Sequence, residues 1–255
     1  SETLAELAEV EIDSKLTLLK EHSNDVRKAY RVDMKSLGGE PVSGLLYVPV
    51  ADGKYPAMIS YMGYGSEVWY ADPSSNPQMI EFMLCVRNQA FNRKPGEEND
   101  WCARGIESKE TYYYRGAFAD AVRAIDFVCS LEKTDLDRVF AAGESQGGAL
   151  TLAAASLDGR LKAIAPSAPF LCDYPDYFVL AGWPGDPIEA AAKKAGMSEE
   201  EMFKVLSYFD IKNFTDRIQC PVIMAIGLQD DVCPPHTNFA GYNHIRTEKS
   251  WICYP

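Results

Sequence analysis

One serine of this chain stands between two glycines at a spacing that suits acyl transfer, in the segment Gly143-Glu144-Ser145-Gln146-Gly147. A free serine hydroxyl is a poor nucleophile, so an enzyme must place it beside a general base and near donors that stabilise an oxyanion. A sharp turn from a strand into a helix exposes such a serine, and small flanking residues let the two backbones approach each other. The spacing therefore predicts Ser145 as a nucleophile.

The residues around this segment decide how much weight the pattern carries. About one chain in ten of this length holds G-x-S-x-G by chance, given ordinary glycine and serine frequencies. Here an apolar run at residues 139–142 precedes it, and small helix-forming residues fill 146–155. A strand, a turn and a helix in this order are typical of a nucleophile elbow. The alternative is an ordinary strand and helix in which Ser145 caps the helix.

A carboxylate follows a later strand, where the acid of a catalytic triad is expected. The apolar run at residues 222–226 leads directly into Gly227-Leu228-Gln229-Asp230-Asp231. A triad acid after a later strand, in the chain order serine and then acid, suits an elbow nucleophile, and we predict Asp230 in this role. Asp231 is the alternative acid. A third reading is that both residues only precede a helix that starts near Pro235.

Two backbone N–H groups are candidates for an oxyanion hole. The N–H group of Gln146, directly after the serine, is the first. The second is expected after an earlier strand, at residues 57–61, where the glycine-rich segment Met62-Gly63-Tyr64-Gly65 follows. We predict the N–H group of Tyr64 as this donor. The alternative is a plain glycine turn beside a core tyrosine.

A general base and a metal site are harder to find in the sequence. Of the three histidines, His236, six residues after Asp230, is a candidate base for which a structural role is favoured, and His22 and His244 are poorer candidates. The three make no H-x-x-x-H pattern, and the cysteines show no zinc-ligand spacing. We therefore predict no metal and no cofactor.

Charge and composition exclude several classes of function. The net charge is −12 and no run of Lys or Arg occurs, which argues against nucleic acid as a partner and favours neutral or weakly charged small substrates. No stretch of 18 or more apolar residues occurs, so no membrane partner is expected. The seven scattered cysteines favour free thiols in a reducing, cytoplasmic compartment, and export with a removed leader stays open.

The remaining patterns predict the elements that position these residues. Apolar residues at helical spacing over residues 1–22 predict a leading helix, and alternating runs at 30–34 and 44–48 predict a β-hairpin. Five short apolar runs, at 57–61, 82–86, 139–142, 161–165 and 222–226, predict strands, and residues 112–131 predict a crossover helix.

These elements together predict the fold class. We expect residues 1–255 to form one α/β domain with a mostly parallel central sheet flanked by helices. Two longer segments, 88–109 and 170–214, are expected to be insertions that form pocket walls, a lid or subunit contacts.

Further motifs extend over most of the chain: Tyr61-Met62-Gly63-Tyr64, Arg87-Asn88-Gln89, Thr111-Tyr112-Tyr113-Tyr114-Arg115-Gly116, Leu206-Ser207-Tyr208-Phe209-Asp210 and Cys233-Pro234-Pro235. In these segments the chain resembles the acetyl xylan esterase/cephalosporin C deacetylase family, which is carbohydrate esterase family seven of the α/β-hydrolases. The resemblance implies a serine esterase that deacetylates short xylo-oligosaccharides and related small acetyl esters, with Ser145 and Asp230 as nucleophile and acid. It also implies a homo-oligomer, a hexamer that hides the active sites from polymers.

The chain departs from that family in two places. Asn88 replaces the glycine of an Arg-Gly-Gln motif, and asparagine accepts a positive φ less readily than glycine, so a small change in a turn is expected. The family's catalytic histidine, in a His-Glu pair after the last strand, does not occur up to Pro255, and we expect it beyond that residue. Two alternatives stay open: a hydrolase-fold protein that binds acetylated sugars without turnover, and a serine hydrolase acting on another acyl ester or a peptide.

Overall fold

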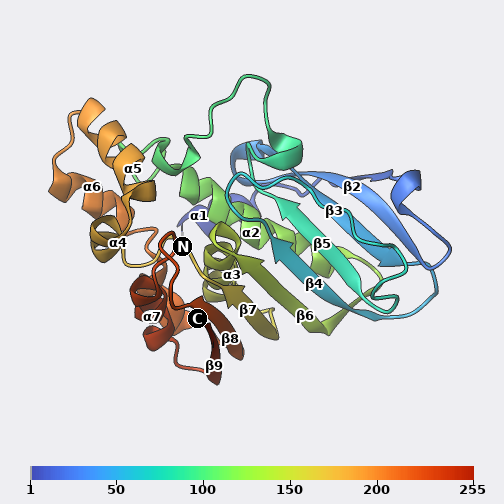
Figure 1. The fold of residues 1–255 in the computed structure, drawn as a ribbon. Helices are drawn as coiled ribbons and strands as arrows, with labels where there is room; N and C mark the ends of the chain where they lie inside the picture. Colours follow the sequence, from blue (N-terminus) through green and yellow to red (C-terminus); the bar gives the residue numbers. More distant parts are fainter. Residues whose placement is uncertain (1) are drawn as a thin grey trace.

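The computed structural model describes residues 2–255. Nine strands form one sheet in the order β1-β2-β3-β5-β4-β6-β7-β8-β9 (Figure 1). The pairs β1/β2, β2/β3 and β3/β5 are antiparallel, and the five other pairs, from β5/β4 to β8/β9, are parallel. The strands are β1 (Lys15–Leu18), β2 (Arg27–Lys35), β3 (Pro41–Pro49), β4 (Tyr55–Tyr61), β5 (Ile80–Cys85), β6 (Thr134–Glu144), β7 (Ala163–Ser167), β8 (Val222–Gly227) and β9 (Lys249–Tyr254). The expected mostly parallel sheet is confirmed.

The five apolar runs and the hairpin form strands as predicted. β2 and β3 pair from Arg27 opposite Pro49 to Lys35 opposite Pro41, and the turn between them contains Gly38 with a φ of 72°. Positive φ values of this kind are cheap for glycine, which explains the Gly-Gly turn.

The predicted leading helix is wrong beyond its first residues. The helix α1 covers only Glu2–Ala8, and β1 follows it and pairs with β2, with Lys15 opposite Asp33. Asp13 has a φ of 44°, which a helix does not allow, and the carbonyl of Ile12 accepts a hydrogen bond from Lys35. Pairing with β2 therefore overrides the local helix preference of this segment.

The helices pack along the parallel part of the sheet and extend one end of the molecule. They are α2 (Tyr113–Ser130), α3 (Gln146–Leu157), α4 (Tyr174–Leu180), α5 (Gly182–Lys194), α6 (Glu199–Leu206) and α7 (Pro235–His244). α2 and α3 pack against each other and against β4 and β6. α4, α5 and α6 lie together at the side of the molecule far from β2 and β3 (Figure 1). They belong to the predicted insertion at residues 170–214, and α6 starts with the capping box of Ser198 and Glu201 that its sequence indicates.

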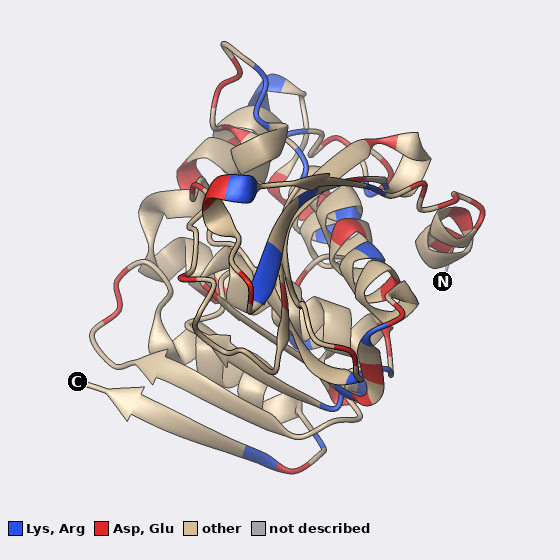
Figure 2. Ribbon diagram, turned by 90° about the vertical axis from the view of Figure 1, so that its right-hand side faces the viewer, with Lys and Arg blue, Asp and Glu red and all other residues tan. Residues whose placement is uncertain are grey.

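Acidic and basic residues are interspersed over loops, helices and strands (Figure 2). The strands next to the C-terminal residue are mostly uncharged in this view. Among the helices that the structure describes, none has both the length and the apolar character that crossing a membrane requires.

Candidate active site

The turn from β6 into α3 holds Ser145 in a strained backbone conformation. Its φ is 55° and its ψ is −118°, values that non-glycine residues rarely adopt. The two glycines of the motif make this turn sterically possible: a Cβ on Gly147 would lie 2.1 Å from the carbonyl oxygen of Tyr61, and a Cβ on Gly143 would lie 2.5 Å from the backbone of Gly147. The strand-turn-helix arrangement is therefore that of a nucleophile elbow.

Backbone hydrogen bonds fix the strained residue from three sides. The N–H group of Ser145 donates to the carbonyl of Ser167 at the end of β7, at 3.0 Å. The carbonyl of Ser145 accepts from the N–H groups of Ala149 and Phe170, both at 3.1 Å. Because β7 and α3 hold the backbone, the strain of the elbow is balanced by bonds on both sides of it.

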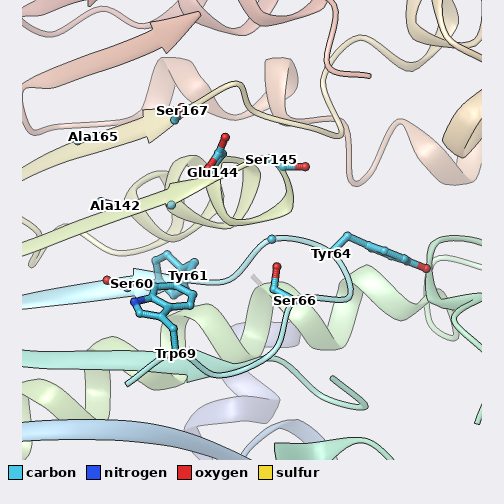
Figure 3. Close-up of a pocket in the computed structure, with 12 residues that line it drawn as sticks. Ser60, Tyr61, Tyr64, Ser66, Trp69, Ala142, Glu144, Ser145, Ala165 and Ser167 are labelled. Carbon is cyan, nitrogen blue, oxygen red and sulfur yellow. The ribbon is translucent and has the colours of Figure 1, made fainter. Parts of the chain in front are cut away.

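Ser145 lines a cavity of about 530 Å³ at the carboxyl ends of β4, β6 and β7. In Figure 3 the serine lies at the end of β6, across from the loop that carries Ser66 and Tyr64. This location is where open α/β sheets bind their ligands. The cavity is lined by Ser60, Tyr61, Gly63, Tyr64, Ser66, Trp69, Ala142, Gly143, Glu144, Ser145, Ala165 and Ser167.

A cysteine that the sequence analysis did not single out faces the candidate nucleophile. The Sγ atom of Cys233 lies 3.8 Å from the Oγ atom of Ser145, and Cys233 is only 3% exposed. The hydroxyl of Tyr177 contacts the same sulfur at 3.7 Å and donates to the carbonyl of Val232. Burial raises the pKa of the Cys233 thiol to about 11, so it is a neutral neighbour of the serine. In the sequence, the only signal for Cys233 is its position in the motif Cys233-Pro234-Pro235.

The carboxylate of Asp230 lies in the loop between β8 and α7, close to this cysteine. Its Oδ1 atom accepts hydrogen bonds from the N–H groups of Val232 and Cys233, at 2.9 and 2.7 Å. Asp230 is thus linked through one residue, Cys233, to the hydroxyl of Ser145. Asp231 is exposed, and the helix α7 begins only at Pro235. The geometry therefore favours Asp230 over Asp231 as the candidate acid.

The two candidate oxyanion donors lie at the ends of β4 and β6. Gln146 is the first residue of α3, so its N–H group has no acceptor within the helix. Tyr64 follows β4, and in Figure 3 its side chain points away from Ser145. The Tyr64 hydroxyl instead donates to the carbonyl of Asn99 and accepts from the N–H group of Cys102, both at 3.0 Å, and burial raises its pKa. Only the backbone of Tyr64 is therefore a candidate donor.

An aromatic wall made of Tyr64, Phe170 and Trp183 borders this loop. The rings of Phe170 and Trp183 stack with centroids 5.1 Å apart, and the Trp183 indole meets the Tyr64 ring edge-on at 5.0 Å. Phe170 is fully buried, whereas Trp183 is 37% exposed. Since Phe170 also donates its N–H to the Ser145 carbonyl, the wall is anchored next to the elbow and presents part of an indole to solvent.

The histidines do not contact Ser145 in the part of the chain that the structure describes. The Nε2 atom of His236 lies 2.6 Å from the Oδ2 atom of Asp176 on α4. His22 stacks on Tyr70 with ring centroids 3.6 Å apart, and His244 ends α7. The alternative that His236 serves as the base therefore has no geometric support.

One group of side chains has the spacing of metal ligands. Ligand atoms of Asp173, Asp176 and His236 lie within 4.8 Å of one another. The carboxylate of Asp173, however, is paired with the amino group of Lys212, and His236 is bonded to Asp176. Asp173 thus has a cationic partner, and His236 and Asp176 bond to each other.

The replaced glycine of the Arg-Gly-Gln motif leaves its turn intact. Asn88 adopts a φ of 63°, the left-handed region that asparagine tolerates best among larger residues. Its side-chain amide donates to the Oε1 atom of Glu97 at 2.9 Å. Asn88 therefore adopts the positive φ of this turn, and the small effect of the replacement stays a prediction.

Comparisons with known proteins agree with this geometry. The sequence model described as acetyl xylan esterase (AXE1) matches residues 1–255. Acetyl esterase Axe7A of Xylanibacter ruminicola is 30% identical over 254 residues, which cover 92% of this chain and 56% of that protein. The chain thus spans little more than half the length of this curated relative.

Two solved structures are similar over the whole chain. The acetyl xylan esterase from Paenibacillus sp. R4 superposes with a TM-score of 0.90 at 31% identity, over 100% of this chain and 85% of that one. Acetyl xylan esterase 1 from Thermoanaerobacterium sp. JW/SL YS485 gives a TM-score of 0.89 at 28% identity, over 100% and 84% of the two chains.

The mostly parallel sheet and the elbow at Ser145 define this chain as an α/β-hydrolase. Within that class, the chain belongs to the acetyl xylan esterase family, which its family match over residues 1–255 shows. The resemblance seen in the sequence motifs is therefore confirmed.

Proposed function

We propose that the protein is a serine esterase that removes acetyl groups from small acetylated carbohydrates such as xylo-oligosaccharides, and from related acetyl esters. The observation that carries this proposal is the elbow at Ser145, which opens on a cavity of about 530 Å³ in a chain of the acetyl xylan esterase family. The net charge of −12 fits a neutral sugar ester better than an acidic substrate.

In the proposed reaction, the Oγ atom of Ser145 attacks the carbonyl carbon of the acetyl group while a base takes the hydroxyl proton. The carbonyl oxygen becomes an oxyanion, which the N–H groups of Tyr64 and Gln146 stabilise. The tetrahedral intermediate then expels the sugar oxygen, which leaves with that proton. Water repeats the attack on the acetyl-serine, which releases acetate and restores the hydroxyl.

Asp230 orients the base in this proposal. The family resemblance implies a histidine as this base, and in the described structure His22, His236 and His244 make other contacts than with Ser145. Asp230 suits its role because its Oδ1 atom is held by two N–H groups of its own loop, which fixes the direction of the carboxylate.

A homo-oligomer is part of the proposal, since the family resemblance implies a hexamer. An assembly that encloses the active sites would favour short oligosaccharides over polymeric xylan. Sedimentation of the purified protein tests the assembly, and a comparison of acetylated xylobiose with acetylated xylan tests the size preference.

The direct test measures acetate release from acetylated xylobiose and from 4-nitrophenyl acetate. Ser145→Ala is expected to lower kcat by at least about 10³-fold, because it removes the attacking atom. Ser207→Ala, at the exposed C-terminal end of α6, is the matched control and is expected to retain the wild-type rate. If the protein releases no acetate, or if Ser145→Ala retains the rate, a hydrolase-fold binding protein or another nucleophile replaces this proposal.

A further inference from the structure

Two glutamine side chains pair with each other in the core directly behind the elbow. The amide of Gln89 donates to the Oε1 atom of Gln146 at 3.1 Å, and the amide of Gln146 donates back to the Oε1 atom of Gln89 at 3.2 Å. The two residues are 1% and 0% exposed. Such a reciprocal amide pair has a fixed separation and orientation, since two parallel hydrogen bonds hold it.

The remaining atoms of the pair reach the two segments that carry the candidate oxyanion donors. The Oε1 atom of Gln89 accepts a hydrogen bond from the N–H group of Gly65 at 2.9 Å, and the amide of Gln146 donates to the carbonyl of Met62 at 3.4 Å. Met62 and Gly65 flank the loop that contains Tyr64. Gln146 itself is the first residue of α3.

Two tyrosines of α2 complete the network. The hydroxyl of Tyr113 accepts from the Gln89 amide at 2.9 Å and donates to the carbonyl of Arg87 at 2.6 Å. The hydroxyl of Tyr114 donates to the Oε1 atom of Gln146 at 3.1 Å. The pair is thereby anchored to a long helix of the core, so it is not free to shift with the loop.

These contacts give the Gln89–Gln146 pair a role beyond filling space in the core. Burying two amides is costly unless they are fully hydrogen-bonded, and an apolar pair of the same volume would avoid that cost. An apolar side chain at position 89 would, however, leave the N–H group of Gly65 without its acceptor. The polar pair is thus the arrangement that couples the loop after β4 to the start of α3.

We propose that Gln89 is a positioning residue that sets the spacing between the Tyr64 and Gln146 N–H groups. This inference rests on the proposed esterase function. Gln89 touches neither substrate nor reacting atoms, and it acts through Gly65 on one side and the Gln146 side chain on the other. Because donors stabilise an oxyanion only when they already point at its position, loosening this spacing weakens the transition state more than the bound substrate.

The variant that tests this is Gln89→Met, which keeps the volume and removes the amide hydrogen bonds. The kcat for 4-nitrophenyl acetate is expected to fall about 10²-fold, as on loss of one oxyanion donor, with KM within about threefold of the wild-type value. Affinity for a boronic acid that forms a tetrahedral adduct with Ser145 is expected to fall with kcat. Unchanged kcat and boronic acid affinity would overturn the proposal.

A matched control separates positioning from a general loss of stability. Thr134→Val removes a buried hydrogen bond to the carbonyl of Val128, far from the elbow, and keeps the side-chain volume. It is expected to lower the melting temperature and to leave kcat of the folded protein unchanged. If Thr134→Val lowers kcat as much as Gln89→Met does, the positioning role is refuted.

Hydrogen exchange measured by mass spectrometry supplies a readout without turnover. Gln89→Met is expected to speed exchange in peptides that cover residues 62–66, relative to Thr134→Val. If Gln89→Met leaves exchange in these peptides unchanged, the coupling between Gln89 and the loop after β4 is refuted, even if the enzyme is active. If Gln89→Met speeds exchange there but the wild-type protein hydrolyses no acetyl ester, the coupling holds and the esterase function is rejected, so the two failures are distinguishable.

Discussion

Arg87 and Asp120 form a two-pronged ion pair between the end of β5 and α2. The Nε and Nη2 atoms of the arginine lie 2.8 and 2.6 Å from the two carboxylate oxygens, and the Asp120 side chain is completely buried. Gly116, one helical turn earlier on α2, leaves room for the guanidinium, because a Cβ there would lie 2.1 Å from its Nη1 atom. This pair fixes the backbone that leads to Gln89.

Asp120→Ala is expected to lower the free energy of unfolding by about 3–5 kcal/mol, because it leaves a largely buried guanidinium without its counter-charge. Urea denaturation followed by tryptophan fluorescence measures the change. The control is Asp216→Ala, which breaks an exposed pair with Arg246 and is expected to change stability by less than about 1 kcal/mol. Equal midpoints for the two variants would contradict this prediction.

Gly147→Ala is expected to destabilise the elbow and to lower activity together. Its new Cβ would meet the carbonyl oxygen of Tyr61 at 2.1 Å, so β4 and α3 would have to move apart, at a cost of about 1–3 kcal/mol or more. Thermal unfolding and acetate release measure both effects. In Gly159→Ala the nearest atom is 3.5 Å away, so this control is expected to fold and turn over normally.

Cys233 is expected to resist alkylation although it contacts the candidate nucleophile. Burial raises its pKa to about 11, so at pH 8 only about one thiol in 10³ is a thiolate, and the neutral form dominates at every pH below about 11. Mass spectrometry after iodoacetamide treatment at pH 8 checks this. Cys253 on β9 is partly exposed and serves as the control that is modified. Rapid labelling of Cys233 in the folded protein would show that the thiol is open to solvent.

The sequence was most informative where function depends on local order. The strand before Ser145, the helix after it and the strand before Asp230 all lie where their apolar patterns place them. The elbow needs glycine at positions 143 and 147 because other backbone atoms lie too close for a Cβ. Its residues are adjacent in the sequence, so a short motif reveals them. The roles of Ser145, Asp230, Tyr64 and Gln146 stay predictions for the experiments above.

Contacts between distant segments were not predictable in the same way. β1 forms because it pairs with β2. β2 lies outside residues 1–22, so the pattern of that segment alone does not predict the strand. The contact between Ser145 and Cys233 joins residues 88 positions apart, and the pair of Gln89 and Gln146 joins residues 57 apart. A single sequence carries no signal for such pairs beyond the motifs in which their members occur.

Trp183 is expected to contribute to sugar binding and not to the chemical step. The Trp183 side chain is 37% exposed and stacks on Phe170, whose N–H group bonds to the Ser145 carbonyl. An exposed indole offers a flat apolar surface to a sugar ring, so Trp183→Ala is expected to raise KM for acetylated xylobiose about tenfold, or about 1.4 kcal/mol. Hydrolysis of 4-nitrophenyl acetate, which has no sugar, is expected to change less than threefold, and Trp183→Phe is expected to retain part of the affinity.

Trp251→Ala removes an indole of 50% exposure on β9 and is the control. Equal losses with both substrates would place Trp183 in the support of the elbow instead of in a sugar site.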